Sequence, residues 1–110
     1  LKRMINASGY KVWPAEVEAT LYKHPDIREV TVISAPDARR GETVKAVVVL
    51  KDECAGQVSP ESIMEWSRGH MAAYKVPRIV EFTDALPRSA SGKIQWRALQ
   101  ELEWEGVERN

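Results

Sequence analysis

A single lysine, Lys93, stands at the end of a Ser/Gly-rich loop. The loop reads Pro-Arg-Ser-Ala-Ser-Gly-Lys over residues 87–93, so that small residues precede the lysine and an amphipathic stretch follows it. An ammonium group on such a loop can reach the negative charge that develops at a carboxylate or a phosphate. The same pattern also fits an ordinary solvated lysine in a turn, and taken alone it favours that interpretation.

The other residue types that commonly carry chemistry are isolated in this sequence. His24 and His70 lack cysteine or carboxylate partners at metal-ligand spacing, so no metal site is expected. Cys54 lies in a polar loop without a neighbouring histidine, which argues against a catalytic thiol. The sequence also lacks a glycine loop of the spacing that binds phosphate. An enzymatic interpretation therefore depends on the loop that carries Lys93.

The composition limits the class of protein. The chain has 110 residues, 44% of them hydrophobic, which suits one compact domain with little room for a separate deep substrate pocket. Its formal net charge is +0, so bulk electrostatics gives no reason to expect nucleic acid or an anionic membrane as a partner. We expect no integral membrane segment, because no apolar run approaches the length of a spanning helix. The single cysteine excludes an internal disulfide and favours a cytoplasmic location.

Hydrophobic periodicity and turn residues predict the elements that must position this loop. The expected order is a hairpin over residues 1–13, a helix from Pro14, strands at 30–33 and 44–50, a helix from Pro60 to about Lys75, a strand at 78–82, the loop at 87–93 and a last helix over 94–104. The short basic loop at 36–41 favours an antiparallel pairing of the two central strands. The prediction is an α+β domain, with a small antiparallel sheet and an N-terminal hairpin backed by helices. Many unrelated proteins share this plan, so it does not by itself indicate a function.

Two segments resemble signature motifs of the adenylate-forming enzymes, which comprise acyl-CoA synthetases, peptide-synthetase adenylation domains and firefly luciferase. The first is Leu-Lys-Arg-Met-Ile-Asn-Ala-Ser-Gly-Tyr-Lys-Val-Trp-Pro-Ala-Glu-Val-Glu at residues 1–18, which resembles the hinge-and-hairpin motif. The second is Leu-Pro-Arg-Ser-Ala-Ser-Gly-Lys-Ile at residues 86–94, which resembles the C-terminal catalytic-lysine motif. Their order and spacing agree with the family, and the resemblance covers essentially the whole chain.

The resemblance implies that residues 1–110 are the small C-terminal lid domain of a larger two-domain ligase, with the hinge at the N-terminal edge. Such an enzyme uses ATP and Mg²⁺ to convert a carboxylic acid to an acyl-adenylate, and then transfers the acyl group to coenzyme A. The lid rotates between the two steps and presents a different face to each. Its partner would be a large N-terminal domain of the same polypeptide, which would hold the ATP loop, the magnesium ligand and the acid pocket. The sequence begins inside a motif, so we expect a piece of a longer protein that is inactive alone.

The resemblance also implies roles for individual residues. Lys93 matches the lysine that bridges carboxylate and phosphate in the adenylation step, with Ser91 and Gly92 supporting the motif. Lys2 matches the hinge position, whose backbone absorbs the rotation. Gly9 matches a glycine in the hairpin that lines the pantetheine tunnel, where a side chain would obstruct the thiol.

A second group of matches concerns the nucleotide end of coenzyme A. Arg40 lies in a loop, and Tyr74 and Lys75 lie at a helix end, where some relatives hold the nucleotide. Arg40 or Lys75 could pair with phosphate, while Tyr74 either stacks on adenine or packs at the edge of the domain. Arg39 fits a solvated charge better than a ligand. The four tryptophans are interpreted as packing residues.

Departures from the family pattern leave the subfamily open. Ser8-Gly9 replaces the paired glycines of many members, and Gln95-Trp96 follows the lysine where a basic residue often stands. The hairpin resembles acyl-CoA synthetases, and fatty-acid ligases among them, more than peptide-synthetase domains that load a carrier-protein thiol. A luciferase-like oxygenase is disfavoured because Asn6 stands where luciferases carry a lysine. The alternative outside the family is a non-catalytic α+β binding module, with its lysine as an ordinary loop residue.

Overall fold

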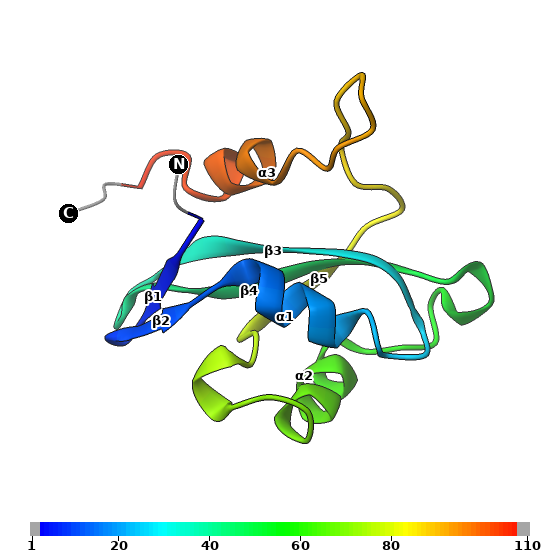
Figure 1. Cartoon of the computed structure of the whole chain (residues 1–110), viewed down its shortest axis with the longest axis horizontal. Coiled ribbons are helices and arrows are strands. Elements are labelled where there is room, and N and C mark those ends of the chain that lie inside the picture. The colour runs from blue at the N-terminus through cyan, green and yellow to red at the C-terminus, as the bar shows by residue number, and fades with distance from the viewer. Residues whose placement is uncertain (1–2, 108–110) are drawn as a thin grey trace.

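The computed structural model describes residues 3–107, which form two small sheets and three α-helices (Figure 1). β1 (Ile5–Ala7) and β2 (Tyr10–Val12) form an antiparallel hairpin that leads into α1 (Pro14–Leu21). β3 (Ile27–Asp37) and β4 (Gly41–Leu50) form a longer antiparallel pair. The remaining elements are the 3-10 turn η1 (Asp52–Cys54), α2 (Pro60–Arg68), the 3-10 turn η2 (Ala73–Lys75), β5 (Ile79–Phe82) and α3 (Trp96–Glu103).

The α+β class predicted from the sequence is confirmed, as are the N-terminal hairpin and the antiparallel pairing of the two central strands. One feature of the prediction is corrected: β5 pairs with β4 in the parallel sense, so the sheet of order β3-β4-β5 is mixed. The connection through α2 crosses over the sheet and brings the chain back to the starting end of β4, which makes the two strands parallel. The second helix also ends earlier than expected, at Arg68, where Gly69 forms its C-cap.

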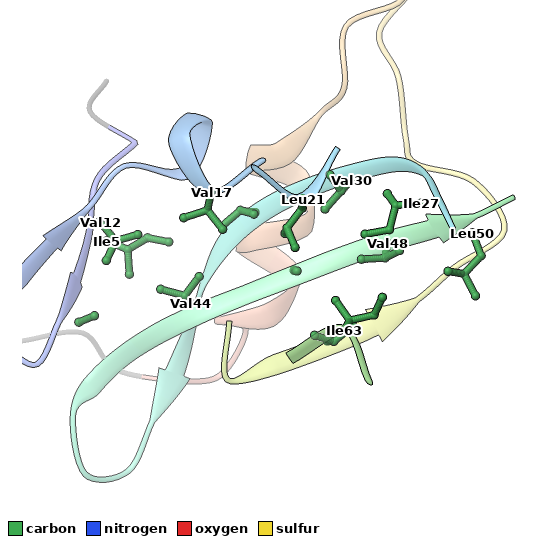
Figure 2. Close-up of a cluster of buried hydrophobic side chains, with 14 residues drawn as sticks. Ile5, Val12, Val17, Leu21, Ile27, Val30, Val44, Val48, Leu50 and Ile63 are labelled. Carbon is green, nitrogen blue, oxygen red and sulfur yellow. The ribbon is translucent and has the colours of Figure 1, made fainter. Parts of the chain in front are cut away.

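The main core lies on the face of the sheet that is covered by the hairpin, α1 and α2 (Figure 2). Alternate residues of β3 and β4 point to this side, as the two-residue period of a strand requires. They meet apolar side chains from the other three elements, and the buried set includes Ile5, Val12, Val17, Leu21, Val30, Val32, Val44, Val48 and Ile63. Burial of this set holds the hairpin against the sheet, and with it the turn that contains Gly9.

The opposite face of the sheet is covered by α3, which lies across the sheet from α2 (Figure 1). A smaller apolar cluster lies there, formed by Ile33, Val47, Val49, Leu86, Ile94, Trp96 and Leu99. Leu86 and Ile94 flank the segment 87–93. Both ends of that segment are therefore anchored by apolar packing, while Lys93 itself is exposed.

An ion cluster centred on the buried Lys45 fastens α3 and β5 to the central strand. Lys45 of β4 has only 6% of its side chain exposed and donates to Glu103 of α3 and Glu81 of β5, each at 2.6 Å. Burial by itself lowers the pKa of Lys45, but the hydrogen bonds to Glu103 and Glu81 outweigh burial and raise that pKa above its usual value. Lys45 is therefore charged throughout the neutral range, and it connects the helix that follows Lys93 to the sheet.

Replacing both Glu81 and Glu103 by glutamine is expected to lower the free energy of unfolding by roughly 3 kcal/mol, because the buried Lys45 ammonium loses both counter-charges. Adding Lys45→Met should restore much of this loss, since an apolar side chain of similar length needs no charged partner. Urea unfolding of the wild type and both variants, followed by tryptophan fluorescence, measures the difference. A double glutamine variant as stable as the wild type would show that the two carboxylates contribute no net stability.

Candidate functional site

Lys93 lies at the end of a hydrogen-bonded turn that projects from the α3 side of the sheet (Figure 1). The ends of the turn pair through an antiparallel bridge between Arg88 and Ile94. The Ser89 N–H donates to the Lys93 carbonyl at 2.8 Å, and the Lys93 N–H donates to Ser89 Oγ at 3.2 Å. The backbone of Lys93 is thus held by its own turn, and this segment is more ordered than its Ser/Gly content suggested.

Ser91 and Gly92 shape this turn directly before the lysine. Gly92 has a φ of +87°, in the left-handed region where a side chain is strained, although a Cβ there would meet no atom within 4 Å. The Ser91 hydroxyl hydrogen bonds with the Ser89 hydroxyl at 2.9 Å. Both residues therefore take part in the turn, and their contribution to a reaction stays a prediction.

The side chain of Lys93 is exposed, and its ammonium forms no hydrogen bond or ion pair within residues 3–107. The lysine thus combines a hydrogen-bonded backbone with a cation that none of the described residues neutralises. Such a cation is available to pair with an anionic group that comes from outside the domain.

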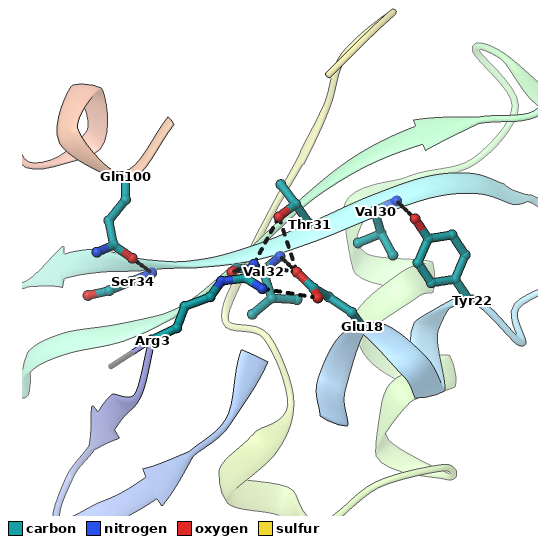
Figure 3. A network of polar contacts seen from close by, with 8 residues as sticks. All are labelled: Arg3, Glu18, Tyr22, Val30, Thr31, Val32, Ser34 and Gln100. Atoms are coloured by element: carbon teal, nitrogen blue, oxygen red, sulfur yellow. Dashed lines mark hydrogen bonds and ion pairs between the residues drawn. The ribbon is translucent and has the colours of Figure 1, made fainter. Parts of the chain in front are cut away.

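The predicted hinge residue, Lys2, lies outside the described residues, but its neighbour Arg3 is firmly held (Figure 3). Arg3 forms an ion pair with Glu18 of α1 and donates to Thr31 Oγ1 at 3.0 Å and to the Val32 carbonyl at 2.8 Å. Glu18 also accepts the Val32 N–H at 2.8 Å. Only 23% of the Arg3 side chain and 16% of the Glu18 side chain is exposed, which strengthens these contacts.

The guanidinium of Arg3 also lies over the indole ring of Trp96, 4.8 Å from its centre. Trp96 begins α3, directly after the Lys93 turn. Arg3 therefore connects the N-terminal edge of the domain to α1, to the edge strand β3 and to the helix behind Lys93. Sequence reasoning missed this network, because the partners of Arg3 lie on elements that are distant in the sequence.

Gly9 stands at the turn of the β1–β2 hairpin with a φ of +90°, and Ser8 before it has a φ of 55°. Two successive positive φ values are those of a two-residue hairpin turn. The Gly9 N–H donates to Asn6 Oδ1 at 2.7 Å, and the Asn6 N–H donates to Glu42 Oε1 at 2.6 Å. A Cβ on Gly9 would meet no atom within 4 Å. Within this domain, glycine is therefore favoured by the backbone conformation of the turn and not by a lack of space.

Tyr74 and Lys75 belong to η2, beside the hairpin. The ring of Tyr74 stacks on that of Tyr10, with centroids 4.8 Å apart and planes 20° apart. Tyr10 is 59% exposed and Tyr74 38%, so the stack presents an aromatic surface to solvent. Lys75 Nζ pairs with Glu16 Oε2 at 3.0 Å, and this hydrogen bond raises the pKa of Lys75. Tyr10 was not predicted, because only the fold brings the two tyrosines together.

Arg40 lies in the turn between β3 and β4. The Asp37 carboxylate accepts the N–H groups of Arg39 and Arg40, each at 2.9 Å, and these bonds lower the pKa of Asp37. Glu42, just beyond this turn, is the residue that accepts the Asn6 N–H of the hairpin. The turn that carries Arg40 therefore lies beside the β1–β2 hairpin.

The residues predicted from the sequence thus form two groups on different sides of the domain. Gly9, Tyr74 and Lys75 belong to the hairpin and η2, which lie on the α1 and α2 side, and Arg40 belongs to the turn beside the hairpin. Lys93 belongs to the turn on the α3 side. Figure 1 shows the hairpin and the orange turn that contains residues 87–93 well apart.

The histidines and the cysteine are engaged in packing contacts. The His24 ring meets Trp66 edge-on at 4.9 Å, and His70 stacks on the same indole at 3.8 Å. Cys54 donates to Asp26 at 3.3 Å, and burial together with this carboxylate raises the pKa of its thiol. Within residues 3–107, no group of His, Cys, Asp and Glu side chains could hold a metal ion. No helix in this range is long and apolar enough to cross a membrane.

Comparison with protein families identifies the class of this domain. The family described as AMP-binding enzyme C-terminal domain matches residues 16–93, a range that ends on Lys93. The chain belongs to this family, as the two sequence motifs indicated.

Several similar proteins are named as acyl-CoA ligases or synthetases. The long-chain-fatty-acid–CoA ligase of Bacillus subtilis is 46% identical over 104 residues, which cover 94% of this chain and 18% of that protein. A feruloyl-CoA synthase of Amycolatopsis sp is 47% identical over 94 residues, which cover 86% of this chain and 19% of that protein. Among solved structures, a Mycobacterium tuberculosis fatty acyl CoA synthetase has a TM-score of 0.83 and 39% identity, over 93% of this chain and 20% of that one. The chain spans about a fifth of the length of these relatives.

Proposed function

We propose that this chain is the mobile C-terminal lid of a two-domain acyl-CoA synthetase. The whole enzyme activates a carboxylic acid with ATP as an acyl-adenylate and then transfers the acyl group to coenzyme A. The observation that carries the proposal is the separation of the two candidate groups, with Lys93 on one side of the sheet and the hairpin of Gly9 on the other. A domain built in this way serves one active site with both faces only if it turns between the steps.

In the first step, we assign Lys93 to the reacting phosphate. A carboxylate oxygen of the acid forms a bond to the α-phosphorus of ATP, and the bond to the departing pyrophosphate breaks. Negative charge gathers where the two anions meet, and a cation at that place stabilises the transition state more than the separate reactants. The ammonium of Lys93 suits this task, because it is exposed and has no partner in the part of the chain that the structure describes. ATP and Mg²⁺ are held mainly by the N-terminal domain in this proposal.

In the second step, we assign coenzyme A to the surface formed by the β1–β2 hairpin, η2 and the turn that carries Arg40. This surface is called the hairpin face below. The thiol sulfur forms a bond to the acyl carbon, the bond to AMP breaks, and the thiol proton passes to solvent. Gly9 leaves the passage for the pantetheine arm open, since nothing projects from its α-carbon. The Tyr10–Tyr74 stack offers a flat surface to the adenine ring, and Arg40 and Lys75 supply charges for its phosphates.

The acid is proposed to be a fatty acid. Support comes from the names of the Bacillus subtilis and Mycobacterium tuberculosis relatives. The feruloyl-CoA synthase is equally similar to this domain, because the acid pocket belongs to the other domain in this proposal. A cytoplasmic location is proposed with it, on the single cysteine of the chain.

The function is tested with the full-length enzyme and a panel of fatty and aromatic acids. We expect that a fatty acid will support exchange of pyrophosphate into ATP, and that thioester formation with coenzyme A will follow. Thioester formation only with a phosphopantetheine-bearing carrier protein would replace this function with that of a peptide-synthetase-type adenylation domain. Absence of exchange with every acid would contradict the proposal.

The ion pair between Lys75 and Glu16 leads to a separate prediction about the KM for coenzyme A. Lys75→Ala is expected to raise the KM for coenzyme A about tenfold, because one charged hydrogen bond to a phosphate is lost. Glu16→Gln should lower that KM, since the phosphate no longer competes with a carboxylate for Lys75. Steady-state thioester assays at varied coenzyme A measure both values, with pyrophosphate exchange as the control. Equal KM values in all three proteins would show that Lys75 does not contribute to the binding of coenzyme A.

A further inference from the structure

The turn that carries Lys93 is tied to the sheet by the side chain of Arg88. Its Nη1 donates to the Gly92 carbonyl at 2.7 Å, and its Nη2 pairs with Glu29 of β3. The Gly92 carbonyl belongs to the peptide bond that leads into Lys93. One guanidinium therefore links the peptide group of this lysine to the edge strand of the sheet.

We propose that Arg88 and Glu29 are positioning residues for Lys93. This inference rests on the proposed function, in which Lys93 acts in adenylation. The hydrogen bonds inside the turn define its shape, and the apolar contacts of Leu86 and Ile94 hold its base. Within residues 3–107 the turn forms no ion pair with the domain other than Arg88–Glu29. The pair therefore sets the direction in which the turn points.

The surroundings of the pair suit this role. Glu29 has 25% of its side chain exposed and Arg88 43%, so the contact is partly shielded from solvent. Glu29 lies where the register of β3 shifts, and such irregularities redirect a side chain from its regular place on a strand. Arg88 serves two acceptors with two separate nitrogens, an arrangement that the fork of a guanidinium provides and a single ammonium does not.

The position of a reacting group decides its catalytic effect. A displacement of about 1 Å from the productive place costs on the order of 100-fold in rate. If Arg88 is lost, the turn can swing on its apolar base while the sheet and the hairpin face stay intact. The damage should therefore fall on the adenylation step and leave the coenzyme A step unchanged.

The test compares Arg88→Ala, Glu29→Gln and their combination in the full-length enzyme, with the two half-reactions assayed separately. Arg88→Ala is expected to lower the kcat of adenylation about 30-fold with little change in the KM for ATP or the acid. Glu29→Gln should lower it about fivefold, and the double variant should match Arg88→Ala, because the two residues act through one link. Arg28→Ala is the matched control, since Arg28 adjoins Glu29 but pairs with Asp52 at 3.2 Å.

Hydrogen exchange of the peptide that covers residues 87–95 gives an independent readout in the same proteins. Faster exchange in Arg88→Ala, and unchanged exchange in Arg28→Ala, is the expected result. The inference is overturned if Arg88→Ala adenylates within about twofold of the wild type, if both half-reactions slow equally, or if the losses of the single variants multiply in the double variant. Lys93→Ala is assayed in parallel as a test of the proposed function itself. Full adenylation without this lysine would reject the proposed function, whereas the hydrogen-exchange result for residues 87–95 would still stand.

Discussion

Lys93→Ala in the full-length enzyme is expected to slow acyl-adenylate formation by about 10²–10³-fold, the usual effect of removing one preorganised charge from a transition state. The reason lies in the geometry of the turn, because an ordered backbone presents an ammonium with no partner among residues 3–107. Exchange of pyrophosphate into ATP measures this step. Thioester formation from preformed acyl-adenylate and coenzyme A should continue at the wild-type rate, since the hairpin face is untouched.

Lys23→Ala is the matched control for this experiment. Lys23 is an exposed lysine just after α1, on the side of the sheet away from the Lys93 turn. Its removal changes the net charge equally and should leave both half-reactions unchanged. Equal behaviour of the two variants would mean that Lys93 is an ordinary surface lysine and that the proposed role is wrong.

Gly9→Val is expected to have the reciprocal effect, a loss of about 100-fold in thioester formation with adenylation retained. A valine at this position places a branched side chain on the surface assigned to the pantetheine arm. It also strains the turn, because a β-branched residue adopts a φ of +90° only at a cost. Single-turnover transfer from acyl-adenylate to coenzyme A measures the loss.

Gly56→Val is the control that distinguishes obstruction of the pantetheine arm from strain in the backbone. Gly56 has a φ of +80° and, like Gly9, no atom within 4 Å of the place that a Cβ would occupy, but it lies in the loop after η1. The two substitutions therefore impose similar backbone strain at different places. If Gly56→Val impairs the thioester step as much as Gly9→Val does, the effect reflects strain and the assignment of the hairpin to coenzyme A fails.

Local sequence signals were sufficient to predict most of the elements. The β-branched runs of the central strands, Pro14 and Pro60 at helix starts, and Gly9 at a tight turn each act within a few residues. The direction of β5 was not predictable in this way. Nothing in residues 79–82 encodes whether the strand runs parallel to β4, because the crossover through α2 decides it.

The parts of the candidate site that were missed depend on long-range contacts. Lys45 stands among apolar strand residues and gives no sign of the two carboxylates that neutralise it from β5 and α3. Arg88 was visible only as a member of the lysine motif, and its partner Glu29 lies on a strand far along the chain. Tyr10 and Tyr74 meet only after the hairpin has packed beside η2. Residue types and spacing indicated the chemistry, whereas the supporting contacts required the fold.

Movement of the lid in the full-length enzyme is measured most directly as a distance between two labelled sites. Cys54→Ser first removes the single native thiol of this chain. One spin label is then placed on Ala90→Cys, in the exposed turn before Lys93, and a second on the N-terminal domain. Double electron–electron resonance then gives the distance between the labels with a non-hydrolysable acyl-adenylate analogue, before and after addition of coenzyme A. An alternating lid should give two distinct distances, with the turn close to the N-terminal domain before coenzyme A is added and farther away afterwards. One unchanged distance in both states, in an enzyme that still completes both steps, would contradict an alternating lid.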